Sequence, residues 1–296
     1  MSMAHLIIDE AFLQQIEALQ SLTRHNVAGM FGGTHKARTY GSSCEFAAHR
    51  EYTDGDDTAR IDWNAYSRFD KLYLKLYLDE RQMHTRIYID ASRSMEYGDA
   101  KKAEQALRLA AFLAYVSICE TDKVSISVIH EDRVEDLIVG MVGKEGYLSA
   151  IGRLNDVRFE GDSAISRALL PASVGYGDGL SILISDFLTD NDYETAIDHL
   201  CEKKRDVFCI QVLSREELNP QVRGRVHFFD SENAEKTYRK NIDRDIIRAY
   251  KQALSYVTDR IQGYCQAREA GYLLATAEDS LGQIFFEKLP GMGVIK

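Results

Sequence analysis

Apolar residues recur along the chain with helical periods in some segments and strand periods in others. Residues 9–23 carry apolar side chains at helical spacing behind an acidic start, which predicts a helix. In residues 72–78, leucines alternate with tyrosine and lysine, which is the period of a strand. A short apolar run at residues 86–89 predicts another strand, which is followed directly by Asp90.

After Asp90 the predicted elements alternate in type. Residues 180–184 form an apolar run of the kind expected for a strand that is buried on both faces. Strands that alternate with helices imply a mostly parallel sheet covered on both sides. The pattern predicts helices at residues 101–120, 147–154, 163–170, 193–204, 243–269 and 280–286, and strands at residues 124–129, 134–139, 180–184, 207–213, 226–229 and 272–275.

This alternation predicts the fold class, which is α/β with a doubly wound, mostly parallel sheet. The first 80 or so residues do not follow the alternation and resemble a separate layer or subdomain. We therefore expect two parts, an N-terminal α+β segment at residues 1–84 and the α/β domain at residues 85–296.

Composition and charge narrow the class of protein. The chain has 296 residues, of which 45% are apolar and 28% charged, as in ordinary soluble domains. The formal net charge of −10 argues against a nucleic-acid partner, whose phosphates would repel the protein. No apolar run approaches the roughly 18 residues of a membrane span, and no secretory signal is visible. We expect a cytoplasmic protein whose five cysteines are reduced and mostly in the core.

Oxygen-bearing side chains follow two of the predicted strands. Asp90, Ser92 and Ser94 come directly after one strand, and Asp186 follows the strand at residues 180–184. Ser163 comes from an intervening loop. Carboxylate and hydroxyl oxygens suit Mg²⁺ or Mn²⁺, and ligands of open parallel sheets bind at the carboxyl ends of the strands. The sequence thus predicts a metal site, although a serine cap of the following helix is an alternative interpretation.

Motifs of common enzymes are missing from the sequence. Lys36 lies between His35 and Ala37, so the glycine-rich stretch before it does not form a Walker loop. The histidines form no H-x-x-x-H or H-E-x-x-H spacing, and neither G-x-S-x-G nor G-x-G-x-x-G occurs. We assign no catalytic residue.

Two stretches of the chain resemble a known family. The run Asp90-Ala91-Ser92-Arg93-Ser94-Met95, with Ser163 and Asp186, is similar to the metal-ion-dependent adhesion site of von Willebrand factor A domains. The more specific run Gly55-Asp56-Asp57-Thr58-Ala59-Arg60-Ile61-Asp62-Trp63, with Ser67-Arg68 and Glu80-Arg81 after it, resembles domain-of-unknown-function family 58. The resemblance implies a von Willebrand A-like, Rossmann-like fold. Ser163 stands where the family usually has threonine, and it keeps the hydroxyl.

The favoured function is a metal-dependent protein-binding module that is not an enzyme. Serine hydroxyls would ligate the cation directly and the aspartates directly or through water, which leaves a position open for an acidic side chain of a partner. The resemblance implies a partner among the MoxR-type AAA+ ATPases, for which such proteins look like adaptors. Further contacts are expected from Arg93, Glu96 and Tyr97.

Two other functions remain open at this point. A metal-dependent phosphoesterase would also use two carboxylates and a cation, and a phosphatase panel would detect it. A structural subunit with an empty site would bind no metal in a titration.

The acidic segment at residues 54–62 also has two interpretations. It is a second cation site or partner surface, or it is a turn at Gly55 whose carboxylates cap a helix near residues 61–66 and pair with arginines. We favour the turn, and we expect Trp63 to anchor this segment on the core.

Overall fold

The computed structural model describes residues 7–23, 46–77, 83–96, 101–120, 122–177, 179–189, 191–222, 224–229 and 237–288. The chain divides into two compact units. The smaller unit is Gly32–Gln82, and the larger unit combines Met1–Phe31 with Met83–Lys296. Each unit is described separately below.

A six-stranded sheet forms the centre of the larger unit. Its order is β10-β7-β6-β3-β4-β5, and all neighbouring strands are parallel except β4 and β5. The predicted fold class, a doubly wound and mostly parallel α/β sheet, is confirmed. The strands are β3 (His84–Asp90), β4 (Lys123–His130), β5 (Arg133–Met141), β6 (Leu180–Ser185), β7 (Asp206–Leu213) and β10 (Gly271–Thr276).

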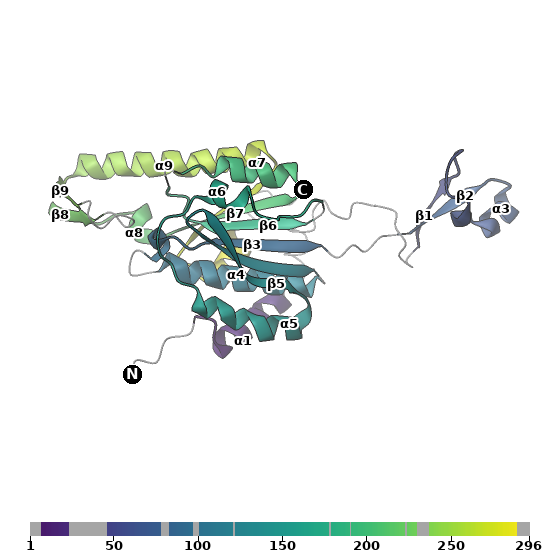
Figure 1. Cartoon of the computed structure of the whole chain (residues 1–296), viewed down its shortest axis with the longest axis horizontal. Helices are drawn as coiled ribbons and strands as arrows, with labels where there is room; N and C mark the ends of the chain where they lie inside the picture. The colour runs from purple at the N-terminus through teal and green to yellow at the C-terminus, as the bar shows by residue number, and fades with distance from the viewer. Residues whose placement is uncertain are drawn as a thin grey trace. The chain divides into compact units, whose positions relative to one another are not determined.

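Helices cover both faces of this sheet (Figure 1). On one face lie α1 (Glu10–Thr23), α4 (Lys102–Cys119) and α5 (Gly143–Ala150), and on the other lie α6 (Ile165–Leu169), α7 (Glu194–Glu202) and α9 (Arg244–Ala267). Successive residues of β3 point to opposite faces, so Ile87 and Ile89 join the first core and Tyr88 joins the second. Both faces of the central strands are therefore buried.

Shorter elements complete the larger unit. The predicted helix at residues 147–154 is divided between α5 and a 3₁₀ helix, Ile151–Asp156, and the predicted helix at residues 280–286 between α10 (Leu281–Gln283) and a π-helical turn, Ile284–Lys288. A 3₁₀ turn, Arg93–Glu96, follows β3, and α8 (Arg215–Leu218) follows β7. The sequence did not predict the 3₁₀ turn or α8, because an element of about one helical turn is too short to show a periodic apolar pattern.

One antiparallel pair stands apart from the main sheet. It consists of β8 (Gly224–Phe229), which the sequence predicts, and β9 (Thr237–Ile242), which it does not. Figure 1 shows this pair at the amino-terminal end of α9, where that helix extends beyond the sheet. Among the described helices, none combines the length and the apolar character that crossing a bilayer requires.

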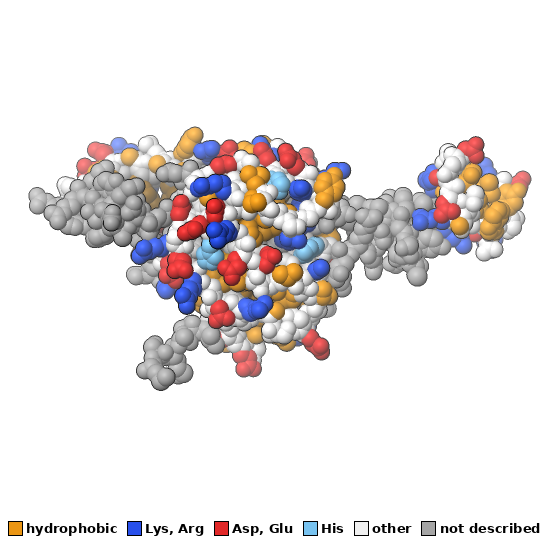
Figure 2. All heavy atoms as spheres, in the orientation of Figure 1, with side chains coloured by type: hydrophobic (Ala, Val, Ile, Leu, Met, Phe, Trp, Pro, Cys, Tyr) orange, Lys and Arg blue, Asp and Glu red, His pale blue; other side chains and the backbone are white. Residues whose placement is uncertain are grey.

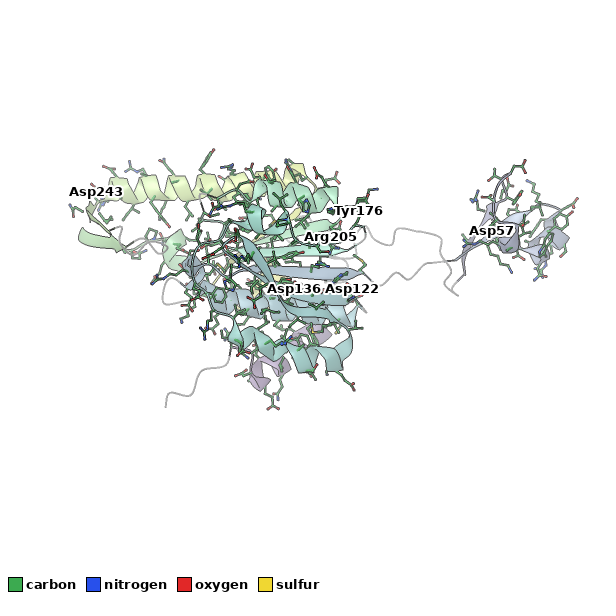
Figure 3. The ribbon with its side chains drawn as sticks, in the orientation of Figure 1. Asp57, Asp122, Asp136, Tyr176, Arg205 and Asp243 are labelled. Atoms are coloured by element: carbon green, nitrogen blue, oxygen red, sulfur yellow. The ribbon has the colours of Figure 1, made fainter. Side chains whose placement is uncertain are left out.

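A buried arginine ties together the amino-terminal ends of three strands. Arg205 precedes β7 and donates hydrogen bonds to the Ser181 hydroxyl (2.6 Å), the Leu180 carbonyl (2.7 Å) and the His84 carbonyl (2.6 Å). Figure 3 shows it at the same end of the sheet as Asp122, which precedes β4. Arg205 therefore has a structural role at this end, whereas ligands of open α/β sheets bind at the opposite, carboxyl end.

The first helix belongs to the larger unit. Phe12 and Ile16 of α1 are buried in the same apolar cluster as the inner face of α4. The sequence prediction placed this helix in an N-terminal segment at residues 1–84, whereas the smaller unit begins at Gly32. The physical reason is the apolar face of α1, which covers part of the core next to α4.

The smaller unit contains an antiparallel strand pair and short helices. Its elements are β1 (Phe46–Glu51), a 3₁₀ helix (Thr58–Arg60), α3 (Trp63–Phe69) and β2 (Tyr73–Tyr77). The acidic segment forms the turn and caps that we favoured. Gly55 has a φ of +100°, Asp57 accepts from the Ala59 N–H, Asp62 caps α3, and Asp56 pairs with Arg50 at 2.6 Å.

Within the smaller unit, Trp63 does not anchor a core. Trp63 is 63% exposed, and its ring contacts Tyr66 edge-on at 6.2 Å. It occupies the first position of α3, whose buried residue is Ala65. The helix thus turns its small alanine inward and its large aromatic rings outward.

Candidate functional site

The sheet changes winding direction between β3 and β6, and Asp90 lies at the carboxyl end of the first of these strands. Asp90 is 3% exposed. Its Oδ1 accepts the Ser92 N–H at 2.9 Å, and its Oδ2 accepts the Ser185 hydroxyl at 2.6 Å. A crevice at such a switch point is where open α/β sheets bind ligands.

Asp186 follows β6 and connects this loop to the one after β3. Ser94 donates its hydroxyl proton to Asp186 Oδ2 across a distance of 2.9 Å, and the Leu188 N–H donates to Oδ1 at 3.0 Å. The Gln211 side chain holds the Asp186 carbonyl at 2.8 Å. The predicted residues from two strand ends therefore lie in one hydrogen-bonded cluster.

The serine hydroxyls of this cluster are oriented by the carboxylates. The Oγ atoms of Ser92 and Ser94 lie 3.1 Å apart. Because Ser94 gives its proton to Asp186, it accepts the Ser92 hydroxyl proton, and one lone pair of its oxygen remains for another ligand. Neither serine caps α4, whose N-cap is Lys101 and has no side-chain hydrogen bond.

Ser163 lies in the loop before α6, and its hydroxyl has no hydrogen-bond partner although the residue is only 2% exposed. This loop runs along the one after β3, because the Arg93 N–H donates to the Gly161 carbonyl and the Glu160 N–H donates to the Ala91 carbonyl, each at 2.9 Å. A buried hydroxyl without a partner is destabilising by about 1–3 kcal/mol. The Ser163 oxygen is therefore free to accept a bond from a water molecule or to ligate a cation.

The electrostatics of the cluster favour a positive charge. Burial raises the pKa of the Asp90 carboxyl, and the negative charge of Asp186 raises it further. Two buried carboxylates that face one another are stabilised by any cation placed between or beside them.

A buried lysine already supplies one positive charge, and the sequence analysis did not identify it. Lys102, the first residue of α4, is 1% exposed. Its Nζ lies 2.7 Å from Asp186 Oδ2 and 2.7 Å from Glu217 Oε1. Burial alone would lower the pKa of Lys102, but the charges and hydrogen bonds of the two carboxylates outweigh that effect and the pKa is raised.

Glu217 is placed by α8. Its side chain completes a capping box in which the Ser214 hydroxyl accepts the Glu217 N–H at 3.1 Å and Glu217 Oε2 accepts the Ser214 N–H at 2.7 Å. The other carboxylate oxygen is thereby turned toward Lys102. Three elements, α4, the end of β6 and α8, thus meet at one ammonium group.

The donor set suits Mg²⁺ or Mn²⁺, which prefer oxygen ligands. Hydrogen bonds join the predicted ligands Asp90, Ser92, Ser94 and Asp186, and the Ser163 hydroxyl, which lacks a partner, lies on the neighbouring loop. In the described ranges, no group of three or more His, Cys, Asp or Glu side chains is arranged to hold a metal ion. Of the predicted rim, Arg93 and Glu96 are exposed, and Tyr97 lies outside the described residues.

A surface hollow of about 880 Å³ has none of the five predicted site residues in its lining. Glu160 and Gly161 line it, and they also make the hydrogen bonds to the loop after β3. Its other walls come from β4, β5 and residues 156–158, with both signs of charge. Figure 2 shows acidic and basic side chains intermixed on the visible face of the larger unit.

Together these features define an α/β protein with a hydroxyl and carboxylate cluster at the switch point of its sheet. Residues 48–258 match the family described as "Protein of unknown function DUF58", and the chain belongs to that family. The resemblance seen in the sequence is thereby confirmed.

The chain is also similar to particular proteins. It is 25% identical over 113 residues to uncharacterized proteins of Mycobacterium bovis and Mycobacterium tuberculosis, which is 38% of this chain and 36% of theirs. The chain therefore matches about a third of the length of these relatives.

Two solved structures align with most of this chain. An aerotolerance-related membrane protein from Bacteroides fragilis is 16% identical, with a TM-score of 0.39 over 71% of this chain and 100% of that one. The SpRpn10 VWA domain is 10% identical, with a TM-score of 0.37 over 68% of this chain and 92% of that one.

Proposed function

We propose that this protein is a von Willebrand A-like protein-binding module whose cluster at the switch point holds Mg²⁺ or Mn²⁺. The hydroxyls of Ser92, Ser94 and Ser163 would ligate the ion. Asp90 and Asp186 would contact the ion directly or through a water molecule. The ion supplies an electrophilic point that accepts a carboxylate oxygen from a partner protein.

The observation that carries this proposal is the hydrogen bonding of two hydroxyls, those of Ser94 and Ser163. The Ser94 proton is committed to Asp186 at 2.9 Å, and the buried Ser163 oxygen has no partner. The Ser94 oxygen thus keeps one lone pair beside the bond that it accepts from Ser92, and the Ser163 oxygen keeps both, so each has a lone pair for a hard divalent ion.

The same arrangement explains how an acidic chain could bind an acidic partner. The chain has a formal net charge of −10, so an approaching carboxylate is repelled at long range. A divalent ion reverses the sign of the local field at the site. We propose that the residues flanking the partner's acidic side chain occupy the hollow of about 880 Å³, because Glu160 and Gly161 line it and also bond to the loop after β3.

We further propose a MoxR-type AAA+ ATPase as the partner and no hydrolase activity for this protein. The partner class comes from the family resemblance alone. The absence of hydrolysis is proposed because the site residues are hydroxyls and carboxylates tied to one another, with no histidine base hydrogen-bonded to a serine within the cluster.

A pull-down from native lysate tests the proposal. The wild-type protein is expected to retain an ATPase in Mg²⁺ and to lose it in EDTA. Asp90→Ala and Asp186→Ala are expected to lose it in Mg²⁺. Asp245→Ala, which removes an exposed carboxylate on α9, serves as the matched control and is expected to retain it.

Two results would contradict the proposal. Capture of an ATPase that is unaffected by EDTA and by both variants would exclude the metal bridge. Phosphatase turnover that disappears in Asp90→Ala would replace the binding module with a metal-dependent phosphoesterase.

A further inference from the structure

Lys102 is unusual for its position in the chain. A lysine in the first turn of a helix is disfavoured by the positive end of the helix dipole, and a lysine is rarely fully buried. Yet Lys102 begins α4 and its side chain is 1% exposed. Its burial is therefore explained by its partners and not by the stability of α4.

Those partners connect Lys102 directly to the candidate cation site. Asp186 Oδ2 accepts hydrogen bonds from both the Ser94 hydroxyl and the Lys102 ammonium, at 2.9 Å and 2.7 Å. Asp186 Oδ1 accepts the Leu188 N–H. Oδ2 thus has both of its lone pairs engaged before any divalent ion arrives, whereas Oδ1 keeps one.

We propose that Lys102 is a resident cation that sets the affinity of the site for the divalent ion. Its ammonium neutralises Asp186, keeps Oδ2 as the acceptor for Ser94, and leaves the ion to be held chiefly by neutral hydroxyls. This inference rests on the proposed function.

The consequence is a site that binds its ion weakly and leaves it strongly charged. With Lys102 present, the charges of Asp90, Asp186 and Lys102 sum to −1, and they would sum to −2 without it. An ion held by fewer negative charges keeps more attraction for an outside carboxylate. The negative charge of Glu217, whose Oε1 lies 2.7 Å from Lys102 Nζ, offsets part of the positive charge that Lys102 brings to the site.

Calorimetric titration with Mg²⁺ alone tests this role. Two variants, one at Lys102 and one at Glu217, are expected to shift the Mg²⁺ affinity in opposite directions. Lys102→Met removes a positive charge next to the site and is expected to tighten Mg²⁺ binding about tenfold. Glu217→Gln keeps the shape of the capping residue, leaves the ammonium less neutralised, and is expected to weaken Mg²⁺ binding about threefold. A lysine that only held the fold together would weaken binding when removed.

The neighbouring lysine provides the matched control. Lys101 precedes Lys102, its side chain is exposed, and it lies 4.0 Å from Glu96. Lys101→Met removes the same charge from the same end of α4, but solvent screens it. Its Mg²⁺ affinity is expected to stay within about twofold of the wild type.

A second variant keeps the test informative if Lys102→Met does not fold. Lys102→Met combined with Glu217→Gln leaves no unpaired charge at Glu217, and it is expected to bind Mg²⁺ about tenfold more tightly than Glu217→Gln alone. Thermal melting gives an independent readout. Added Mg²⁺ should raise the melting temperature of the double variant more than that of the wild type.

The outcomes separate this inference from the proposed function. If the wild type binds Mg²⁺ and removal of Lys102 leaves the affinity equal or lower, the resident-cation role is overturned and the metal site stands. If only variants without Lys102 bind Mg²⁺, the role is supported and the wild-type metal site is refuted. If no variant binds Mg²⁺, both are overturned.

Discussion

Ser163 and Ser166 are both buried and differ in their hydrogen bonding. Ser163 Oγ has no partner, whereas Ser166 Oγ accepts the Ala196 N–H at 3.0 Å. Ser163→Ala removes an unsatisfied group, so we expect the metal-free protein to gain roughly 1 kcal/mol of unfolding free energy. The same variant should bind Mg²⁺ more weakly. Urea unfolding in EDTA and calorimetric titration measure the two effects.

Ser166→Ala is the control for that experiment. It leaves the Ala196 N–H without its acceptor and is expected to lose about 1 kcal/mol of stability with no change in Mg²⁺ affinity. Ser163→Ala would contradict the assignment if it were destabilising by as much as Ser166→Ala, because its hydroxyl would then have a partner.

His84 makes the stability of the larger unit dependent on pH. Burial lowers the pKa of His84 to about 4, and Arg86, Arg205 and Lys123 add to the effect. Because the unfolded chain takes up a proton near pH 6.5 and the folded chain does not, stability that is present above pH 6.5 is lost as the pH falls toward 4.

His84→Gln removes this titration. We expect the wild type to lose about 1 kcal/mol more than the variant between pH 7.5 and pH 5, after allowance for partial exposure. Urea unfolding at the two pH values checks this. Equal losses in the two proteins would show that His84 titrates normally in the folded state.

At the residue scale, the sequence predicted that the loops after two strands lie together, and the hydrogen bond between Ser94 and Asp186 joins them. Asp90 and Asp186 could be predicted because each follows an apolar run. Lys102 could not be identified as part of the site, since Lys101-Lys102 reads as an exposed pair at a helix start. Its partner Glu217 lies 115 positions away and is placed by a four-residue helix that has no periodic pattern.

Among the elements, β6 is the one most completely enclosed. All six of its residues are buried, and it pairs with β3 and β7 on its two sides. Ile182→Ala at its centre leaves a cavity between two well-packed layers, and we expect a loss of about 3–5 kcal/mol. Thermal or urea unfolding measures it.

An exposed strand position gives the comparison. Val139 on the edge strand β5 is exposed, so Val139→Ala should change the unfolding free energy by less than about 0.5 kcal/mol. A loss of less than 1 kcal/mol for Ile182→Ala would mean that the layers close around the cavity or that β6 is not central.

The same burial explains which elements the sequence could predict. Strands such as β6 and β7 and the helix α4 show an apolar pattern along their whole length, and their predicted bounds lie within two residues of the structure. β9 reads Thr-Tyr-Arg-Lys-Asn-Ile and has no clear alternation, so only its pairing with β8 identifies it as a strand.

At the scale of the whole molecule, the core of the larger unit combines segments that precede and follow the smaller unit in the sequence. Ile16 of α1 is fully buried in the cluster that also contains Phe112 and Leu113 of α4. Ile16→Ala is therefore expected to destabilise the larger unit by about 2–5 kcal/mol. Gln15→Ala at the exposed neighbouring position should have little effect. Unfolding followed by circular dichroism distinguishes them, and equal stabilities would place α1 outside the core.

Because the smaller unit lies between α1 and β3 in the sequence, packing α1 against the core closes a long loop. The entropy lost in such a closure grows only with the logarithm of the loop length, so doubling the roughly 60 residues between α1 and β3 would add only about 0.6 kcal/mol. The intervening unit can therefore lengthen, shorten or be exchanged with little change in the closure entropy that the core of the larger unit must offset.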